Sequence, residues 1–98
     1  MYEKTKGDFA ERLTEDKISE IVNEPVKMAI LDFIEKKGPC SFGDIIKELS
    51  ISQPAGMNHI LELKLTGLLE RNTSPPNYDI NRERFKKVKE YLKSKGEN

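Results

Sequence analysis

Residues 41–71 read SFGDIIKELSISQPAGMNHILELKLTGLLER, which predicts two short helices, a tight link between them and a strand after the second. Ser41 precedes Asp44 by three residues, the spacing of a capping box, in which side chains satisfy the free N–H groups at a helix start. Ile45 and Leu49 lie four residues apart and give this helix an apolar face. The first helix is therefore expected to begin after Ser41 and to pack one face against a core.

The second helix follows the short link at residues 50–52. Ser52 is able to cap it, and Pro54 is tolerated in its first turn because the first amides of a helix lack intrahelical acceptors. Gly67 then provides a stop, and residues 68–71 read as a strand. A helix, a tight turn and a second helix that opens in small polar residues form the pattern of the helix-turn-helix motif.

The second helix also resembles a family signature. The residues that carry the resemblance are Ser52-Gln53-Pro54-Ala55, His59, Leu63 and Gly67-Leu68, at the spacing S-Q-P-A-x-x-x-H-x-x-x-L-x-x-x-G-L. This signature is typical of winged helix-turn-helix repressors of the arsenic-repressor (ArsR-like) type. Residues 24–31, EPVKMAIL, are similar to the D-P-T-R-L-A-I-L helix of that family, and the resemblance covers roughly Glu24 to Ile80.

The resemblance implies a mainly α fold with a small β-hairpin. It implies a single winged helix-turn-helix domain over residues 1–98, with added N- and C-terminal helices. The helix-turn-helix would occupy about residues 41–67, the wing about 68–80, and a C-terminal dimerisation helix about 82–95. The implied function is that of a cytoplasmic transcription regulator, a repressor that binds double-stranded DNA sequence-specifically as a homodimer.

The rest of the chain fits this organisation. Thr14 precedes two acidic residues, which predicts a capped helix start. Pro25 opens the most hydrophobic helix, expected to run to about Lys37, and Asn81 caps a final helix. Strands are expected at residues 68–71 and 77–80, joined by a proline-rich turn at 72–76.

Composition limits the possible functions. The chain has 98 residues, 17 basic and 17 acidic, and its net charge of zero is unusual for a nucleic-acid-binding protein. Residues 71–98 nevertheless hold 8 basic and 4 acidic residues. This positive charge either forms a surface that attracts nucleic acid or simply keeps the exposed face of the last helix solvated. No apolar run is long enough for a membrane span, and a single cysteine is consistent with a reducing compartment.

Neither an enzyme nor a metal cofactor is expected. The chain has one histidine, one cysteine and no glycine-rich phosphate loop. Metal sensors of the resembled family carry a C-x-C pair on the first helix of the motif, or His and Asp ligands on the last helix. This sequence has neither, since Cys40 stands alone before that helix. A redox role for Cys40 stays open beside the simpler role of a small filler residue.

Residues of the predicted interface with double-stranded DNA fall mainly on the second helix. The candidate contacts are Ser41, Ser52, Gln53, Ala55, Met57, Asn58, His59, Lys64 and Arg71. Glutamine and asparagine can read an adenine edge with two hydrogen bonds, and histidine can donate to a phosphate. A helical wheel buries Gly56, Ile60, Leu63 and Gly67, and places Ala55, Asn58, His59, Glu62 and Thr66 on the polar face.

Two further surfaces are expected. Met57, Leu61 and Leu65 widen the apolar arc of the second helix, and the alternative function is therefore a winged helix that binds a protein partner in a transcription-related assembly. The resemblance also implies a homodimer through the first and last helices. The candidate seam residues are Leu13, Ile18, Ile21, Val88, Tyr91 and Leu92.

Overall fold

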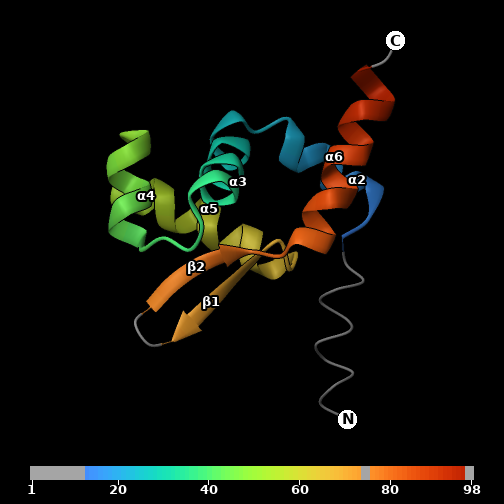
Figure 1. The fold of residues 1–98 in the computed structure, drawn as a ribbon. Helices are drawn as coiled ribbons and strands as arrows, with labels where there is room; N and C mark the ends of the chain where they lie inside the picture. The colour runs from blue at the N-terminus through green and yellow to red at the C-terminus, as the bar shows by residue number, and fades with distance from the viewer. Residues whose placement is uncertain (1–12, 74–75, 97–98) are drawn as a thin grey trace.

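The computed structural model describes residues 13–73 and 76–96, which form five helices and one two-stranded antiparallel hairpin (Figure 1). The elements are α2 (Glu15–Val22), α3 (Pro25–Lys37), α4 (Phe42–Leu49), α5 (Gln53–Leu65), β1 (Leu69–Thr73), β2 (Pro76–Ile80) and α6 (Arg82–Gly96). The predicted class, mainly α with a small β-hairpin, is confirmed. Within these residues, no helix is both long and apolar enough to cross a membrane.

Side-chain caps define where the helices begin. In α2, α4, α5 and α6, the side chain just before the helix accepts a backbone N–H three residues on, at donor–acceptor distances of 3.0–3.3 Å. The capping residues are Thr14, Ser41, Ser52 and Asn81. The remaining helix, α3, opens with Pro25, whose missing N–H would have had no intrahelical acceptor. All five starts agree with the sequence prediction.

The link between α4 and α5 is as short as predicted. Ser50 ends α4 with φ 54° and ψ 47°, a left-handed conformation, and the Ile51 N–H donates to the Ile46 carbonyl at 3.3 Å. Gly56 allows the two helices to approach, because a Cβ at this position would lie 2.5 Å from Ile46 Cδ1. The turn and this close contact hold α5 against α4.

The end of α5 is a Schellman motif, in which two amides after the helix bond back to its last turn. The Gly67 N–H donates to the Lys64 carbonyl at 3.0 Å, and the Leu68 N–H to the Leu63 carbonyl at 3.1 Å. Gly67 has φ +80°, a conformation that side chains with a Cβ rarely adopt. Leu63 and Leu68 are both fully buried, so the motif also fixes the direction in which β1 leaves the helix.

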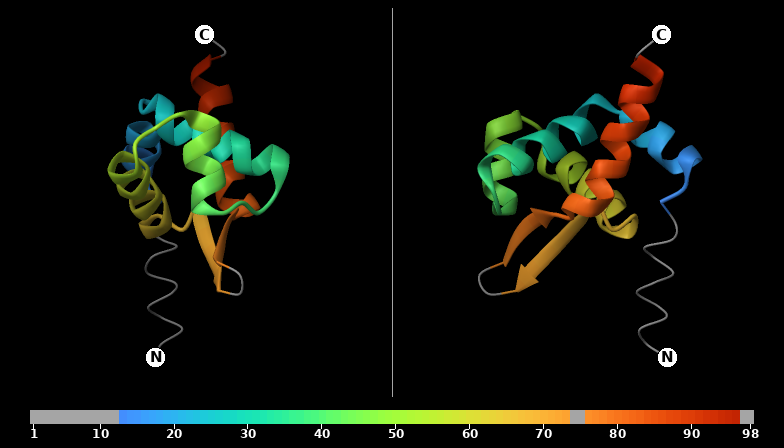
Figure 2. Two further views of the ribbon diagram at one scale, coloured as in Figure 1. Left: turned by 90° about the vertical axis from the view of Figure 1, so that its left-hand side faces the viewer. Right: turned by 45° about the vertical axis from the view of Figure 1, so that its right-hand side comes forward.

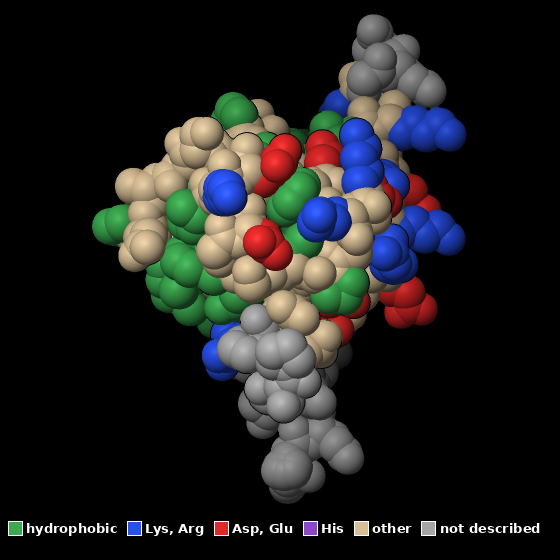
Figure 3. Space-filling view, turned by 60° about the vertical axis from the view of Figure 1, so that its left-hand side comes forward, with side chains coloured by type: hydrophobic (Ala, Val, Ile, Leu, Met, Phe, Trp, Pro, Cys, Tyr) green, Lys and Arg blue, Asp and Glu red, His purple; other side chains and the backbone are tan. Residues whose placement is uncertain are grey.

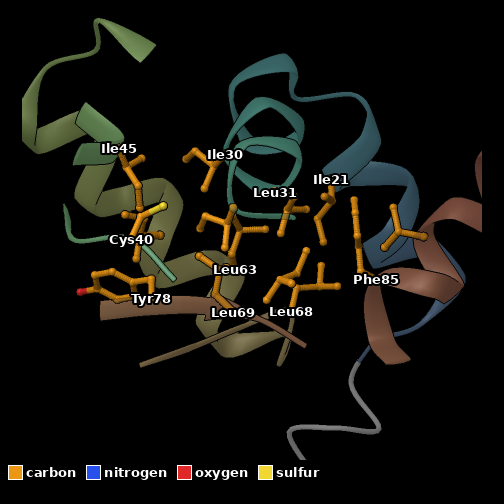
Figure 4. Packing of buried hydrophobic residues seen from close by; sticks show 14 of the residues in the cluster. Ile21, Ile30, Leu31, Cys40, Ile45, Leu63, Leu68, Leu69, Tyr78 and Phe85 are labelled. Atoms are coloured by element: carbon orange, nitrogen blue, oxygen red, sulfur yellow. The ribbon is translucent and has the colours of Figure 1, made fainter. Parts of the chain in front are cut away.

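The core runs along the centre of the molecule. The Ile30, Leu31 and Ile34 side chains of α3 are fully buried, and α3 contacts α2, α4, α5 and β2. Figure 4 shows the cluster extending from Cys40 and Tyr78 at one end to Phe85 at the other. In the views of Figures 1 and 2, α4 and α6 lie on opposite sides of this core.

The hairpin is longer than the sequence predicted. Its strands pair from Leu69 opposite Ile80 to Thr73 opposite Pro76, whereas the prediction ended the first strand at Arg71 and began the second at Asn77. The extra pairing requires no hydrophobic side chain, so an apolar pattern could not reveal it.

The connector before α4 joins the sheet through Cys40. Its N–H donates to the Tyr78 carbonyl at 3.0 Å, and the Tyr78 N–H donates back at 2.7 Å. This bridge ties the hairpin to the start of α4.

Gly67→Ala should lower the free energy of unfolding by about 1–2 kcal/mol, because alanine is strained at φ +80° and its Cβ would displace the Arg84 side chain, whose Nε would lie 2.7 Å away. Urea denaturation measures the change. Gly43→Ala is the matched control, since Gly43 lies in α4 with only an ordinary contact at its Cβ position, 3.9 Å from Ser41 Oγ. This control should leave stability unchanged or raise it by up to about 1 kcal/mol. Equal effects of both substitutions would contradict the conformational explanation.

Candidate nucleic-acid interface

The first two turns of α5 place polar side chains on the outside of the molecule. Gln53 in the first turn and Asn58 in the second are exposed, about 140° apart around the helix, while Gly56, Ile60 and Leu63 are buried. Ala55, Met57 and His59, also predicted as contacts, are half-buried. The buried residues therefore hold the start of α5 against the rest of the protein, and its exposed residues remain accessible. A DNA-recognition helix requires both.

The other predicted contact residues lie further apart. Ser41 and Ser52 use their hydroxyl oxygens as helix caps, which leaves the hydroxyl hydrogens to donate. Lys64 is half-buried near the far end of α5, about 16 Å along the helix axis from Gln53. Arg71 is exposed on β1. Apart from these serines, the predicted polar contacts thus lie in the first two turns of α5, whereas Lys64 lies at its far end and Arg71 lies on β1.

His59 has one buried ring nitrogen. Nδ1 is the only side-chain nitrogen or oxygen in the described part of the chain that is buried without a hydrogen-bond partner. A bare nitrogen lone pair costs less to bury than an N–H group with no acceptor. A contact of this side chain with a phosphate or a base would therefore use the other ring nitrogen, Nε2.

Glu62, expected on the polar face, is held by an ion pair that the sequence did not predict. Its carboxylate pairs with the ammonium of Lys27 on α3, a side chain only 11% exposed. This hydrogen bond lowers the pKa of Glu62, and the neighbouring charges of Lys27 and His59 also contribute. Lys27 compensates the Glu62 charge, so this carboxylate opposes a nearby phosphate less than an unpaired one would.

Thr66, also expected on the polar face, is buried. Its hydroxyl donates to the Leu63 carbonyl at 2.8 Å within the last turn of α5. This bond satisfies the hydroxyl without water, which allows the side chain to turn inward. The prediction of an exposed Thr66 was wrong because the helical wheel does not describe a side chain bonded to its own backbone.

The second half of α5 is apolar and exposed. Leu61 and Leu65, the α5 leucine pair, have 46% and 59% of their area exposed, while Met57 is half-buried. Figure 3 shows hydrophobic side chains gathered at its left-hand edge, the side on which α5 lies in the left view of Figure 2. A groove of about 820 Å³ opens beside Leu65, between α2, the start of α3 and the end of α5.

The predicted dimer seam needs correction. Ile18, Ile21 and Val88 are no more than 5% exposed within the single chain, so they belong to its core and not to a surface between copies. Leu13 and Tyr91 are half-buried, and Leu92 is 39% exposed. The error arises because α2 packs against α6, so the apolar faces of both helices are already covered.

Cys40 is a buried thiol. Its Sγ donates to the Gly38 carbonyl at 3.0 Å, and burial, with the nearby Asp44 charge, raises its pKa. Reactive cysteines have lowered pKa values and solvent access, so this environment favours the filler role. Across residues 13–73 and 76–96, no group of three or more His, Cys, Asp and Glu side chains is arranged to hold a metal ion.

Comparisons with models of protein families, with curated protein sequences and with solved structures found no match to this chain.

Glu62→Gln should reduce the free energy of unfolding at neutral pH by at most about 1 kcal/mol, because Glu62 is 60% exposed and solvent screens the pair. A carboxylate with a lowered pKa stabilises the fold above its unfolded pKa, and this contribution is lost as the pH falls through the folded pKa. The difference between wild type and variant should therefore begin to shrink near the ordinary Glu pKa of about 4.3, and should vanish only below the lowered pKa of the folded state.

Urea denaturation at a series of pH values measures this difference. Glu20→Gln is the matched control, because Glu20 pairs with Lys17 where both side chains are well exposed. A cost of Glu62→Gln that is independent of pH would show that packing, not charge, is responsible.

Proposed function

We propose that this chain is a winged helix-turn-helix transcription regulator that binds double-stranded DNA sequence-specifically as a homodimer, as a repressor and without a metal cofactor. The observation that carries the proposal is the exposure of Gln53 and Asn58 at the capped start of α5, above the buried Gly56 and Ile60. Recognition helices of this motif contact base edges with residues near their N-termini.

The arrangement of α4, α5 and the hairpin supports the proposal. Three residues separate α4 from α5, and β1 starts four residues after α5 ends. The Schellman motif at Gly67 and the bridge between Cys40 and Tyr78 fix the hairpin relative to both helices. In a winged helix, such a hairpin contacts DNA beside the recognition helix.

The exposed edge of α6 supports a smaller dimer seam than the sequence suggested. Leu92 is exposed and Tyr91 is half-buried on the same edge, and Leu13 is half-buried at the start of the described chain. A second copy would cover this edge and place two copies of α5 on one duplex. Two half-sites about one helical turn of DNA apart suit a dimer of this kind.

A second candidate function is supported by the α5 leucine pair. Leu61 and Leu65 offer exposed apolar area that DNA does not require. The groove beside Leu65 is lined mainly by charged and polar side chains, so an amphipathic helix of a protein partner would place its apolar face on the leucine pair and its polar face along the groove. In this case α5 would serve as a protein-interaction surface in a transcription-related assembly.

Gln53→Ala and Asn58→Ala should each reduce discrimination between a selected operator and a random duplex. A good base contact contributes about 1–3 kcal/mol of discrimination, or roughly 5- to 150-fold in the ratio of dissociation constants. Lys64→Ala and Arg71→Ala are the comparison variants, because phosphate contacts should weaken binding to all duplexes alike. Fluorescence anisotropy titrations on duplexes selected from a random library measure both effects.

Two results would contradict DNA reading by α5. One is that no duplex is selected over random sequence. The other is that both alanine variants keep full discrimination. If, in addition, Leu61→Ala and Leu65→Ala abolish a purified complex with a protein partner, the second candidate function is correct.

Leu92→Asp should convert the protein from a dimer to a monomer of 11.3 kDa, because it places a charge at the centre of the exposed α6 edge. Multi-angle light scattering measures the mass, and far-UV circular dichroism checks that the variant is folded. Lys86→Asp is the control, since Lys86 is exposed on the same helix away from this edge. An unchanged mass for Leu92→Asp would exclude the seam.

A further inference from the structure

The positive charge of this protein is concentrated in one helix. Residues 82–96, which form α6, hold 7 basic and 2 acidic residues, while the rest of the chain holds 10 basic and 15 acidic residues. A chain with zero net charge is thus divided into a basic helix and an acidic remainder. This uneven distribution gives α6 a positive potential that attracts anions.

Four of the basic residues of α6 form a straight row. Arg82, Lys86, Lys89 and Lys93 are separated by four, three and four residues, which places them within about 60° of one another around the helix. The row extends over about 16 Å of helix axis. One strand of a DNA duplex carries a phosphate every 3.4 Å or so along its axis, so the row spans about five phosphates.

All four residues of this α6 basic row are exposed. Lys89 pairs with Glu35 of α3 and lies 5.1 Å from the Phe85 ring centroid, which fixes the middle of the row. Arg82, Lys86 and Lys93 make no ion pair with any residue in the described ranges. Three cations are therefore held along one line of a helix and remain available to an anionic partner.

The α6 basic row is distinct from both surfaces discussed above. The apolar side of α6, with Phe85 and Val88, faces the core, and the exposed Leu92 lies about 60–120° around the helix from the row. In Figures 1 and 2, α6 lies across the core from α4, against which the start of α5 packs. A dimer seam at Leu92 would border Lys89, three residues earlier, whereas Arg82, Lys86 and Lys93 lie about 80–120° around the helix from Leu92.

We propose that the α6 basic row binds the sugar–phosphate backbone of double-stranded DNA, as a second, sequence-independent contact separate from the start of α5. The choice of DNA as the polyanion rests on the proposed function. Few other cations are available for phosphates in this part of the chain, since Lys64 and Arg71 are the only basic residues from Ser52 to Asn81. Sequence would then be read by α5, while α6 contributes affinity.

The test compares two variants of the full chain that remove the same charge at different places. The row variant is Arg82→Gln/Lys86→Gln/Lys93→Gln. The matched control is Lys36→Gln/Lys37→Gln/Lys47→Gln, whose residues are exposed on α3 and α4. Circular dichroism and thermal melting establish that both variants are folded.

Binding to a random duplex is measured between about 50 and 200 mM salt, where affinity falls steeply with the number of phosphate contacts. The row variant should bind more weakly at low salt. The slope of its plot of log affinity against log salt should be smaller in magnitude by about three, or one for each lost phosphate contact. The control should follow the wild type. Equal slopes for the row variant and the control would overturn the proposal.

Failure of this proposal is distinguishable from failure of the proposed function. If Gln53→Ala and Asn58→Ala lose discrimination while the row variant behaves as the control, α5 reads DNA and α6 does not bind it. If the row variant alone loses binding, the α6 contact stands and sequence reading by α5 fails. Vesicles of phosphatidylserine and phosphatidylcholine provide a third arm. Loss of vesicle binding by the row variant, with duplex binding intact, would assign the row to a membrane surface and overturn the proposal.

Discussion

The packing of α3 against four other elements is the interaction on which the rest of the structure depends. Ile30, Leu31 and Ile34 are fully buried and contribute about 2 kcal/mol each by leaving water. The same helix contacts α2, α4, α5 and β2, and its Lys27 pairs with Glu62. Only 36% of the residues in the chain are hydrophobic, so several elements bury their apolar side chains against this one helix. The position of α5 is therefore set from beneath by α3 and from one side by α4.

Local signals in the sequence were sufficient to predict where the helices start and that α5 ends near Gly67. Caps and a left-handed glycine act through the backbone within a few residues, so Ser41, Ser52 and Asn81 could be read without tertiary information. The exposure of Asn58 followed from the helical wheel, whereas that of Gln53 was expected from the resemblance to the family signature. These features account for the predicted fold class and for the accessible start of α5.

Features that depend on neighbours in space were missed. The stripe of Val88 and Leu92 looks continuous in the sequence, yet α2 packs against α6, Val88 is buried and Leu92 is exposed. The buried Lys27 was read as part of an apolar helix, because its partner Glu62 lies 35 residues away. The strands of the hairpin extend to Thr73 and Pro76 through backbone pairing, which carries no signal in the side chains.

The two candidate partners of α5 occupy different halves of the helix, so they are compatible. Gln53 and Asn58 lie in the first two turns, whereas Leu61 and Leu65 lie in the last two. Covering the remaining exposed area of both leucines would add roughly 2 kcal/mol, comparable with one good base contact. Neither contribution is large enough to make the other irrelevant. The ion pair of Lys27 and Glu62 lies in the second half, between Leu61 and Leu65, and anchors that half of α5 to α3, beside the surface that a protein partner would cover.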